Sequence, residues 1–584
     1  MIGRLWLCLP VAVVFAQAQE PEGDVVLRAM RDELKRSVSL TLANLERPYF
    51  IEYALHDGES LSISATLGAL VSSYRSRFRA PRIQVRVGDY KFDNTNYVLS
   101  DFSFGGGVEA GQMPVEDSYD GLRHHFWLAT DRAYKSALQS IARKRAALQN
   151  VSVREDLPDF ARAEAARSLL EFRKESVDEE EWKQRMRTLS AVFAGYPEIV
   201  NSSADMEAVL GVFRYVNSEG SEARTPEKLI YVRVKATAIA PDGMSLRLAE
   251  VFHSRVLDRM SSDVELKKGA LDLAETLRLL ARAPIGEAYT GPVLFESRAA
   301  AQLFAEVLGR NLAARRRPVS EPGRPLPFVD SEFEGRIGSR ILPEWIDVVD
   351  DPTQTEWRGR ALLGHYQVDL EGVPARPVNL VEKGMLKNML RTRQPVRAGE
   401  GSNGRARLPG GFGAKAPGFG NLFVHARQTV SMEEMRKKLV NLCRLSGKPY
   451  GIIIRRMDFP SSASMEEFRR IASRMSQAGG HPVSLPVVVS LLHTDGREEP
   501  VRGLSFRGLS GRSLRDIVAA SEDTTVFDYL DNSAPFALMG AGSFVAESSV
   551  IAPSVLFEEL QLERAEEEIR KPPIVPPPSV AAVK

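Results

Sequence analysis

Cysteine is almost absent from this chain, whose 584 residues contain only Cys8 and Cys443. Cys8 lies in an N-terminal apolar run that we expect to be removed, so one cysteine remains in the mature protein. A single cysteine can form neither an intrachain disulfide nor a multi-cysteine metal site. Cys443 falls on the apolar side of an expected helix with Leu439 and Leu442, which is the usual setting of an unreactive thiol.

The sequence also lacks a long apolar segment and an excess of either charge. Lys and Arg total 77 and Asp and Glu total 76, a net charge of +1, and no large basic patch is evident, so we expect no nucleic-acid partner. After Arg4, the apolar run from Leu5 to Phe15 is too short to span a bilayer, and Ala16-Gln17-Ala18 fits a small-x-small cleavage site. We predict a signal peptide at 1–18 and an exported protein, periplasmic or secreted, without a transmembrane span. An uncleaved N-terminal anchor is the alternative.

Length and periodicity predict the domain organisation. A chain of 584 residues is too long for one compact core, and its 43% apolar and 26% charged residues are ordinary for a globular protein. We predict an α+β protein with two lobes. The expected units are an N-terminal and middle α+β domain at 24–285, with a charged helical insertion near 129–192, a strand-rich C-terminal domain at 286–560, and a charged, Pro-rich tail at 565–584.

Local patterns predict the elements within these domains. Helices are expected at 23–45, 129–149, 159–175, 178–192 and 261–282. Strands are expected at 49–56, 61–70, 83–87, 229–240, 245–252, 450–455 and 486–492. Turn chemistry predicts one hairpin at Asp57-Gly58 and another at Pro241-Asp242-Gly243. Two capping boxes predict helix starts, Ser431 with Glu434 and Ser464 with Glu467.

One predicted helix, 296–312, carries the residues on which the functional interpretation depends. At about 100° per residue, an inward-facing stripe collects Ala300, Leu303, Phe304, Val307 and Leu308. The opposite face collects Ala305, Glu306, Gly309 and Arg310. Glu306 and Arg310 are spaced i, i+4 in the favourable order, and an exposed pair of this kind contributes only about 0.3–0.5 kcal/mol.

Short stretches between about residues 280 and 425 have a distinctive order and spacing. They are Tyr289-Thr-Gly-Pro-Val-Leu-Phe-Glu296, Ala299-Ala-Ala-Gln-Leu-Phe-Ala-Glu306, Phe333 to Arg340, Val348-Val-Asp-Asp351, Asp369 to Pro374, Leu380 to Leu386, Ser402-Asn-Gly-Arg405 and Gly418-Phe-Gly-Asn421. Together they resemble the TldD/PmbA family, once called modulators of DNA gyrase. Tyr49 to Tyr53 and Ile83 to Tyr90 extend a weaker likeness toward the N-terminus. The resemblance implies the two-lobed α+β fold of that family and its usual dimeric state.

The chain departs from that family at the metal ligands. Catalytic members are zinc peptidases acting on peptides or unfolded chains. They carry His-Glu-x-x-x-His on the helix that aligns with Ala305 to Arg310, and a later cysteine ligand. Here Ala305 has no donor atom, Arg310 is a permanent cation, and only Glu306 remains, as a vestigial catalytic residue. Zinc needs three protein ligands and an open position to activate water, so we expect no metal and no cofactor.

Other chemistries find less support. A replacement metal site would have to draw on histidines that do not stand at ligand spacing, namely His124, His125, His253, His365, His425, His481 and His493. A Gly-x-Ser-x-Gly nucleophile elbow is missing. The glycine-rich stretch Gly401 to Gly420 lacks the strand-then-helix context of a phosphate loop. The corresponding family region lies near the substrate cleft, so a flexible peptide-binding loop is the functional interpretation, and a plain surface loop is the other.

We therefore expect a proteolysis-related TldD/PmbA homologue with a degenerate zinc motif. It would be a non-catalytic peptide-binding or partner subunit that forms a homodimer, or a heterodimer with a catalytic paralogue. A peptide or unfolded polypeptide would bind by adding a strand to an exposed sheet edge. Two alternatives stay open: an active metallopeptidase with an unrecognised metal site, and a structural envelope protein.

Overall fold

The computed structural model describes residues 23–42, 45–97, 108–109, 113–149, 156–319, 328, 330–399, 401–409, 414–459, 483–531 and 546–565. The predicted signal peptide, the capping box at Ser464 and Glu467, and all but the first residue of the predicted tail lie outside these residues. Among the described residues, helix makes up 25% and strand 42%, and the predicted two-lobed α+β fold is confirmed.

The N-terminal lobe is built on a 7-stranded sheet with the order β3-β2-β1-β5-β6-β4, in which β7 also pairs with β6. Its strands are β1 (Pro48–Thr66), β2 (Ala69–Val87), β3 (Val108–Glu109), β4 (Arg167–Leu169), β5 (Ile199–Asn217), β6 (Glu222–Ile239) and β7 (Ser245–Ser254). Neighbours are antiparallel except β4 and β6. The predicted hairpin of β6, the Pro241-Asp242-Gly243 turn and β7 is confirmed.

The predicted hairpin turn at Asp57-Gly58 is wrong. Both residues lie in the middle of β1, and the chain reverses at Leu67 and Gly68, whose φ angles are 47° and 85°. Two positive φ angles are typical of a type I′ hairpin turn. Gly58 instead faces Gly211 of β5, and a Cβ on Gly58 would lie 2.7 Å from the Gly211 Cα. This glycine allows a close approach of two strands.

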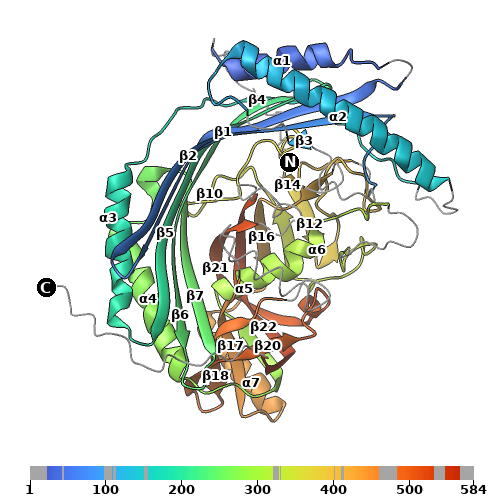
Figure 1. Cartoon of the computed structure of the whole chain (residues 1–584). Coiled ribbons are helices and arrows are strands. Elements are labelled where there is room, and N and C mark those ends of the chain that lie inside the picture. Colours follow the sequence, from blue (N-terminus) through green and yellow to red (C-terminus); the bar gives the residue numbers. More distant parts are fainter. Residues whose placement is uncertain are drawn as a thin grey trace, which may run out of the picture.

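Two pairs of helices cover the N-terminal sheet. Helices α3 (Glu179–Ser190) and α4 (Asp263–Arg282) pack on the sheet face that points away from the C-terminal lobe, and α1 (Val25–Ser37) and α2 (Tyr119–Leu148) cross one end of the sheet (Figure 1). The predicted helix at 159–175 is wrong, so the charged insertion is helical only in part. Residues 167–169 form β4 because they pair with β6, and the Arg224 Nε donates to the Leu170 carbonyl at 2.8 Å.

The C-terminal lobe is built on an 11-stranded sheet with the order β13-β12-β9-β16-β22-β8-β17-β18-β19, in which β20 and β21 also pair with β22. The strands of this sheet are β8 (Tyr289–Phe295), β9 (Ile346–Asp350), β12 (Val378–Glu382), β13 (Met385–Leu386), β16 (Asn421–Ala426), β17 (Tyr450–Met457), β18 (Pro486–His493), β19 (Glu498–Val501), β20 (Leu504–Arg507), β21 (Ile517–Asp531) and β22 (Ala546–Arg564). Two small hairpins join β10 (Glu356–Trp357) to β11 (Arg360–Ala361) and β14 (Ala406–Pro409) to β15 (Lys415–Pro417).

Helix α7 (Met432–Leu445) packs on this sheet and begins at the predicted capping box, in which Ser431 and Glu434 satisfy each other's backbone N–H groups. Cys443 is buried on its apolar side, as predicted. The predicted strands at 450–455 and 486–492 are also confirmed, as β17 and β18. No helix of the described residues is both long and apolar enough to cross a bilayer.

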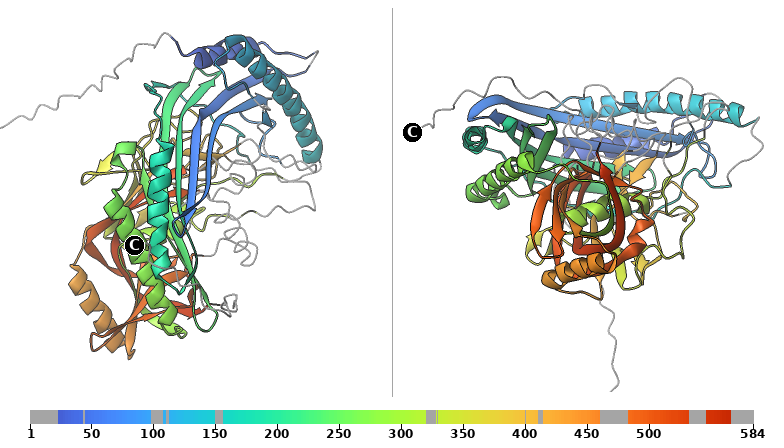
Figure 2. Two further views of the ribbon diagram at one scale, coloured as in Figure 1. Left: turned by 60° about the vertical axis from the view of Figure 1, so that its left-hand side comes forward. Right: turned by 90° about the horizontal axis from the view of Figure 1, so that it is seen from below.

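A central helix lies inside the ring of C-terminal strands, as the view from below in Figure 2 shows. It consists of α5 (Arg298–Leu303), a π-helical turn η3 (Phe304–Gly309) and α6 (Arg310–Leu312). Every residue from Ala299 to Gly309 is buried. The helix is therefore the core of the lobe and has no solvated face, because strands surround it.

Ion pairs join the two lobes, and in most of them the cation belongs to the C-terminal lobe. These pairs are Arg298 with Glu250, Arg316 with Asp159, Arg393 with Glu219, Lys415 with Glu52, Arg456 with Glu250 and Arg502 with Asp242. The pair of Arg255 with Glu547 runs the other way. The lobes are therefore docked by complementary charge as well as by apolar contacts.

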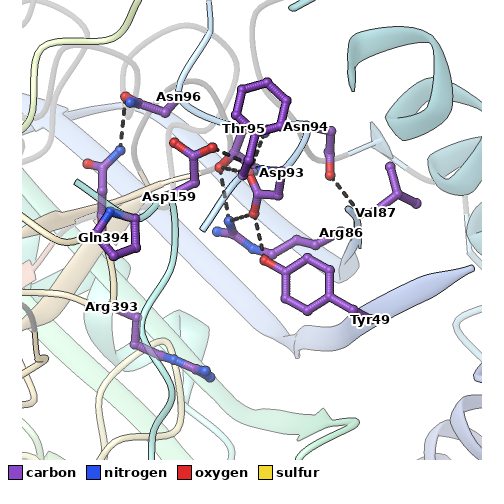
Figure 3. Close-up of polar contacts among 12 residues, drawn as sticks. Tyr49, Arg86, Val87, Asp93, Asn94, Thr95, Asn96, Asp159, Arg393 and Gln394 are labelled. Carbon is purple, nitrogen blue, oxygen red and sulfur yellow. Dashed lines mark hydrogen bonds and ion pairs between the residues drawn. The ribbon is translucent and has the colours of Figure 1, made fainter. Parts of the chain in front are cut away.

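A buried polar network beside this junction fixes the end of β2 (Figure 3). The Asp93 carboxylate accepts from the Tyr49 hydroxyl, from Arg86 and from the Thr95 backbone and hydroxyl, each at 2.7 Å. The Asp93 backbone N–H in turn donates to Asp159 at 2.9 Å. Because Asp159 also faces Arg316 across the junction, this network connects the sheet of one lobe to the chain that leaves the central helix of the other.

Candidate functional site

The π-helical turn changes which side chains of the central helix lie together. In a regular α-helix, residues five apart are separated by about 140° around the axis. A π-turn bonds residue i to residue i+5 and stacks positions five apart. Ala305 and Arg310 are five apart across this turn, so they share one face. The backbone geometry that would suit two ligands at this spacing is present, although neither residue is a ligand.

Glu306 is not on a solvated surface, so the predicted exposed pair is wrong. Only 4% of its side chain is exposed. The predicted contact itself exists, because Arg310 Nη1 donates to Glu306 Oε1 at 3.2 Å. Ser484 adds two further donors, its backbone N–H to Oε2 at 2.8 Å and its hydroxyl to Oε1 at 3.1 Å. Both carboxylate oxygens are therefore engaged, and the group is a structural anchor for the segment at Ser484.

A cavity of about 250 Å³ opens beside this carboxylate. The polar part of its lining includes Glu306, Arg310 and Arg315, and the apolar part includes Val307 and Leu509. A second cavity, of about 20 Å³, lies on the other side of Arg310 and Arg315 and has room for about one water. The cavities thus flank the two arginines that follow the π-turn.

Arg315 is the side chain in this site that sequence reasoning missed. Its Nε is buried and has no hydrogen-bond partner. Burial lowers the pKa of Arg315, and nearby Arg310 lowers it further, while Asp531 acts in the opposite direction. No sequence pattern indicates this arrangement, because Arg315 lies in a basic run with Arg316 and Arg317 that is typical of a solvated segment.

The residues at this site do not fit zinc. Ala305 presents a methyl group, Arg310 presents a cation, and Glu306 is held by three donors. Within the described parts of the chain, no group of three His, Cys, Asp or Glu residues could hold a metal ion. Two of the candidate histidines have other contacts, since His365 Nδ1 lies 2.8 Å from the Pro352 carbonyl and His493 lies beside Glu499. His481 lies outside the described residues.

Several of the stretches that carry the resemblance meet in a buried scaffold. Arg405 of Ser402-Asn-Gly-Arg405 forms an ion pair with Asp350 of β9, and neither residue is exposed to solvent. The Gly420 backbone N–H donates to Asp350 Oδ1 at 3.0 Å. Asp369 accepts from three backbone N–H groups, those of Glu371, Val373 and Ala406. These contacts hold the loops between the strands in place, and the residues that make them do not line the larger cavity.

The glycine-rich stretch 401–420 is not uniformly loop. Residues 406–409 and 415–417 form the β14–β15 hairpin, and residues 410–413 between them lie outside the described residues. Lys415 of β15 is buried against Glu52 of β1 at 2.8 Å, so this stretch attaches one lobe to the other. Gly418 and Phe419 line the smaller cavity. The hairpin therefore has a structural role, and its peptide-binding role stays a prediction.

Sequence comparison assigns the C-terminal lobe to a family. Residues 288–465 match the PmbA/TldA metallopeptidase C-terminal domain. A metalloprotease of Methanothermobacter thermautotrophicus is 28% identical over 191 residues, which are 32% of this chain and 40% of that relative. A metalloprotease of Archaeoglobus fulgidus is 34% identical over 78 residues, 13% of this chain and 17% of that relative. The chain thus matches less than half of the length of either relative.

Solved structures extend the likeness of fold to both lobes. TldE from Thermococcus kodakarensis has a TM-score of 0.56 and 14% identity, covering 91% of this chain and 99% of that one. A candidate modulator of a DNA gyrase from Thermotoga maritima has a TM-score of 0.53 and 14% identity, covering 88% and 96%. With the match of the C-terminal domain, these findings place the chain in a class of metallopeptidase-related, two-lobed proteins. Its C-terminal lobe belongs to the TldD/PmbA family by the match at residues 288–465, and the fold of both lobes is of the same type.

Proposed function

We propose that this protein is an exported, non-catalytic member of the TldD/PmbA family that holds a peptide segment in the cavity beside Glu306. The observation that carries the proposal is the state of this carboxylate, which accepts from Arg310 and from two donors of Ser484. A carboxylate has about four acceptor sites, and occupying three of them reduces its capacity to take a proton as a general base. A carboxylate fixed by three donors, with an alanine and an arginine at the ligand positions, is poorly suited to metal-assisted hydrolysis.

The shape of the site supports binding over a purely structural role. The helix keeps its π-turn, and Gly309 keeps the helix close to Phe419, whose ring would lie 2.4 Å from an added Cβ. The cavity of about 250 Å³ persists next to this turn. A protein with only a scaffold role would gain stability by filling such a space, because unfilled core volume costs contacts. We propose that the occupant is a peptide or an unfolded polypeptide, and that the dimer partner is a second copy or a catalytic paralogue.

The test uses the purified chain from residue 19 and a fluorescently labelled unfolded polypeptide, reduced and alkylated α-lactalbumin. Binding is measured by fluorescence anisotropy, and cleavage by mass spectrometry with added zinc and with a chelator. We expect saturable binding without cleavage. Cleavage that a chelator and Glu306→Gln both abolish would establish an active peptidase instead. Absence of both binding and cleavage would leave the structural envelope role.

A variant that fills the cavity locates the binding site. Ser510 lines the cavity, so Ser510→Trp should weaken binding of the labelled polypeptide at least tenfold. Val518→Trp is the matched control, because Val518 is 42% exposed on β21 and lies outside the cavity lining. Equal binding by the two variants would place the polypeptide elsewhere on the molecule.

A further inference from the structure

We propose that the cavity beside Glu306 recognises the C-terminal residue of a peptide, with the terminal carboxylate on the Arg315 guanidinium. The inference rests on the proposed peptide-binding function and specifies the chemical group that the site recognises. It depends on three features of the described residues: an arginine without a partner, an adjoining apolar wall, and acidic neighbours that are engaged or at the rim.

Arg315 differs from the arginines around it in having no acceptor. Arg310 donates to Glu306 at 3.2 Å. Arg316 donates to the carbonyl groups of Pro158 and Leu157 at 2.6 and 3.2 Å. Arg317 forms an ion pair with Asp330 at 2.7 Å. Among the residues that the structure describes, none accepts a hydrogen bond from Arg315 or forms an ion pair with it, and its Nε is buried.

An arginine in this state costs the free protein stability. Arg315 is half-buried and its Nε is fully buried, and removing that N–H from water without an acceptor is unfavourable. The nearest charges do not compensate fully, because Arg310 repels Arg315 while Asp531 attracts it without a hydrogen bond. A planar carboxylate is the group that a guanidinium binds best, through two parallel hydrogen bonds. The missing partner is therefore supplied most simply by a ligand.

The rest of the lining determines which carboxylate fits. Val307, Val483 and Leu509 supply apolar surface to the cavity. Its volume of about 250 Å³ suits a single residue with an aliphatic side chain. Two acids of this lining are engaged elsewhere, since Glu306 is held by Arg310 and Ser484, and Asp330 is held by Arg317. Glu332 is exposed at the rim and would repel a second carboxylate, so an acidic segment is disfavoured and one terminal carboxylate is favoured.

The experiment uses a pool of N-acetylated pentapeptides that end in valine, leucine or isoleucine, made as free acids and as C-terminal amides. The pools are passed over the immobilised full chain, and the retained peptides are quantified by mass spectrometry. We expect the free acids to be retained at least tenfold more than the amides. Equal retention of acids and amides would overturn the carboxylate site and leave peptide binding intact. If neither pool is retained and the unfolded polypeptide does not bind either, both proposals are overturned. If neither pool is retained but the unfolded polypeptide still binds, only the carboxylate site is overturned.

Variants test whether the preference for free acids depends on Arg315 itself or on positive charge in general. Arg315→Gln should lose the preference for free acids, and Arg315→Lys should restore part of it. Arg340→Gln is the control, because Arg340 is exposed, pairs with exposed Glu344 and lies outside the cavity lining. Thermal unfolding gives a second readout. Arg315→Gln should raise the Tm of the free protein, because the substitution removes an uncompensated charge. If Arg315 had a structural role, the same substitution would lower the Tm. A lower Tm together with an unchanged acid preference would overturn the assignment.

Discussion

At the scale of single residues, Glu306 shows how one buried carboxylate can hold two segments together. It joins the central helix to Ser484 through two hydrogen bonds. The i, i+4 contact between Glu306 and Arg310 could be predicted from their spacing in the sequence. The burial of Glu306 could not, because the neighbouring Ala305 and Gly309 are typical of a surface face and are buried only by the surrounding strands.

Removing this anchor should destabilise the protein. Glu306→Ala leaves Arg310 and the Ser484 donors without an acceptor, and we expect the free energy of unfolding to fall by about 2–4 kcal/mol. Glu306→Gln keeps an acceptor oxygen and should cost about half as much. Urea denaturation measures both values. Glu171→Ala is the control, since Glu171 is exposed and pairs only with exposed Arg173, and a Glu306→Ala variant as stable as this control would contradict the structural role.

Arg405 should not be replaceable by lysine. Its guanidinium bonds Asp350, and its Nη1 and Nη2 donate to the carbonyl groups of Asn403 at 2.7 Å and Arg376 at 2.6 Å. An ammonium cannot reach these acceptors in three directions. Arg405→Lys should therefore lower the free energy of unfolding by about 2–4 kcal/mol. Arg340→Lys, at an exposed pair with Glu344, should change it by less than about 0.5 kcal/mol, and similar values for the two variants would refute the argument.

At the scale of elements, what could be predicted depended on whether the signal was local. The α7 capping box and the turn between β6 and β7 are each formed by residues only a few positions apart, and both were predicted correctly. The β4 segment was predicted as helix because its pairing partner, Glu222 to Arg224, lies about fifty residues later. The π-turn and the unpartnered Arg315 depend on packing by strands distant in sequence, so no local pattern could indicate them.

Gly58 provides a test of the corrected β1 strand. Gly58→Ala would place a Cβ 2.7 Å from both the Gly211 Cα and the Leu210 carbonyl oxygen. Because backbone of the neighbouring strand cannot move aside easily, we expect a loss of about 1–3 kcal/mol in the free energy of unfolding. Gly195→Ala meets nothing within 4 Å and should be neutral or stabilising by up to about 1 kcal/mol. If Gly58 were in an exposed turn, the two variants would behave alike.

At the scale of the whole molecule, a buried acidic pair near the lobe junction makes stability depend on pH. Burial raises the pKa of Glu371, and the neighbouring Asp369 carboxylate raises it further, although Arg393 and Lys415 oppose this. A raised carboxyl pKa means that the folded state holds the proton more tightly than the unfolded state. The stabilisation from this group is complete below the ordinary carboxyl pKa of about 4, and it is lost as the pH rises through the higher folded-state pKa.

Glu371→Gln should remove this dependence. The amide keeps an oxygen for the Arg393 backbone N–H, which donates to Glu371 at 2.7 Å, and it has no proton to lose. We expect the free energy of unfolding to fall less steeply for the variant than for the parent between about pH 5 and pH 8. Denaturation curves across this range measure the two slopes. Parallel slopes would mean that Glu371 does not titrate in this window.

The buried contact between Lys415 and Glu52 also restricts how the molecule can move. A small hinge motion that parts the ammonium from its carboxylate without admitting water would leave two buried charges uncompensated, at a cost of several kcal/mol. Slightly opened conformers would then be rare. The two lobes should therefore tumble in solution as one body.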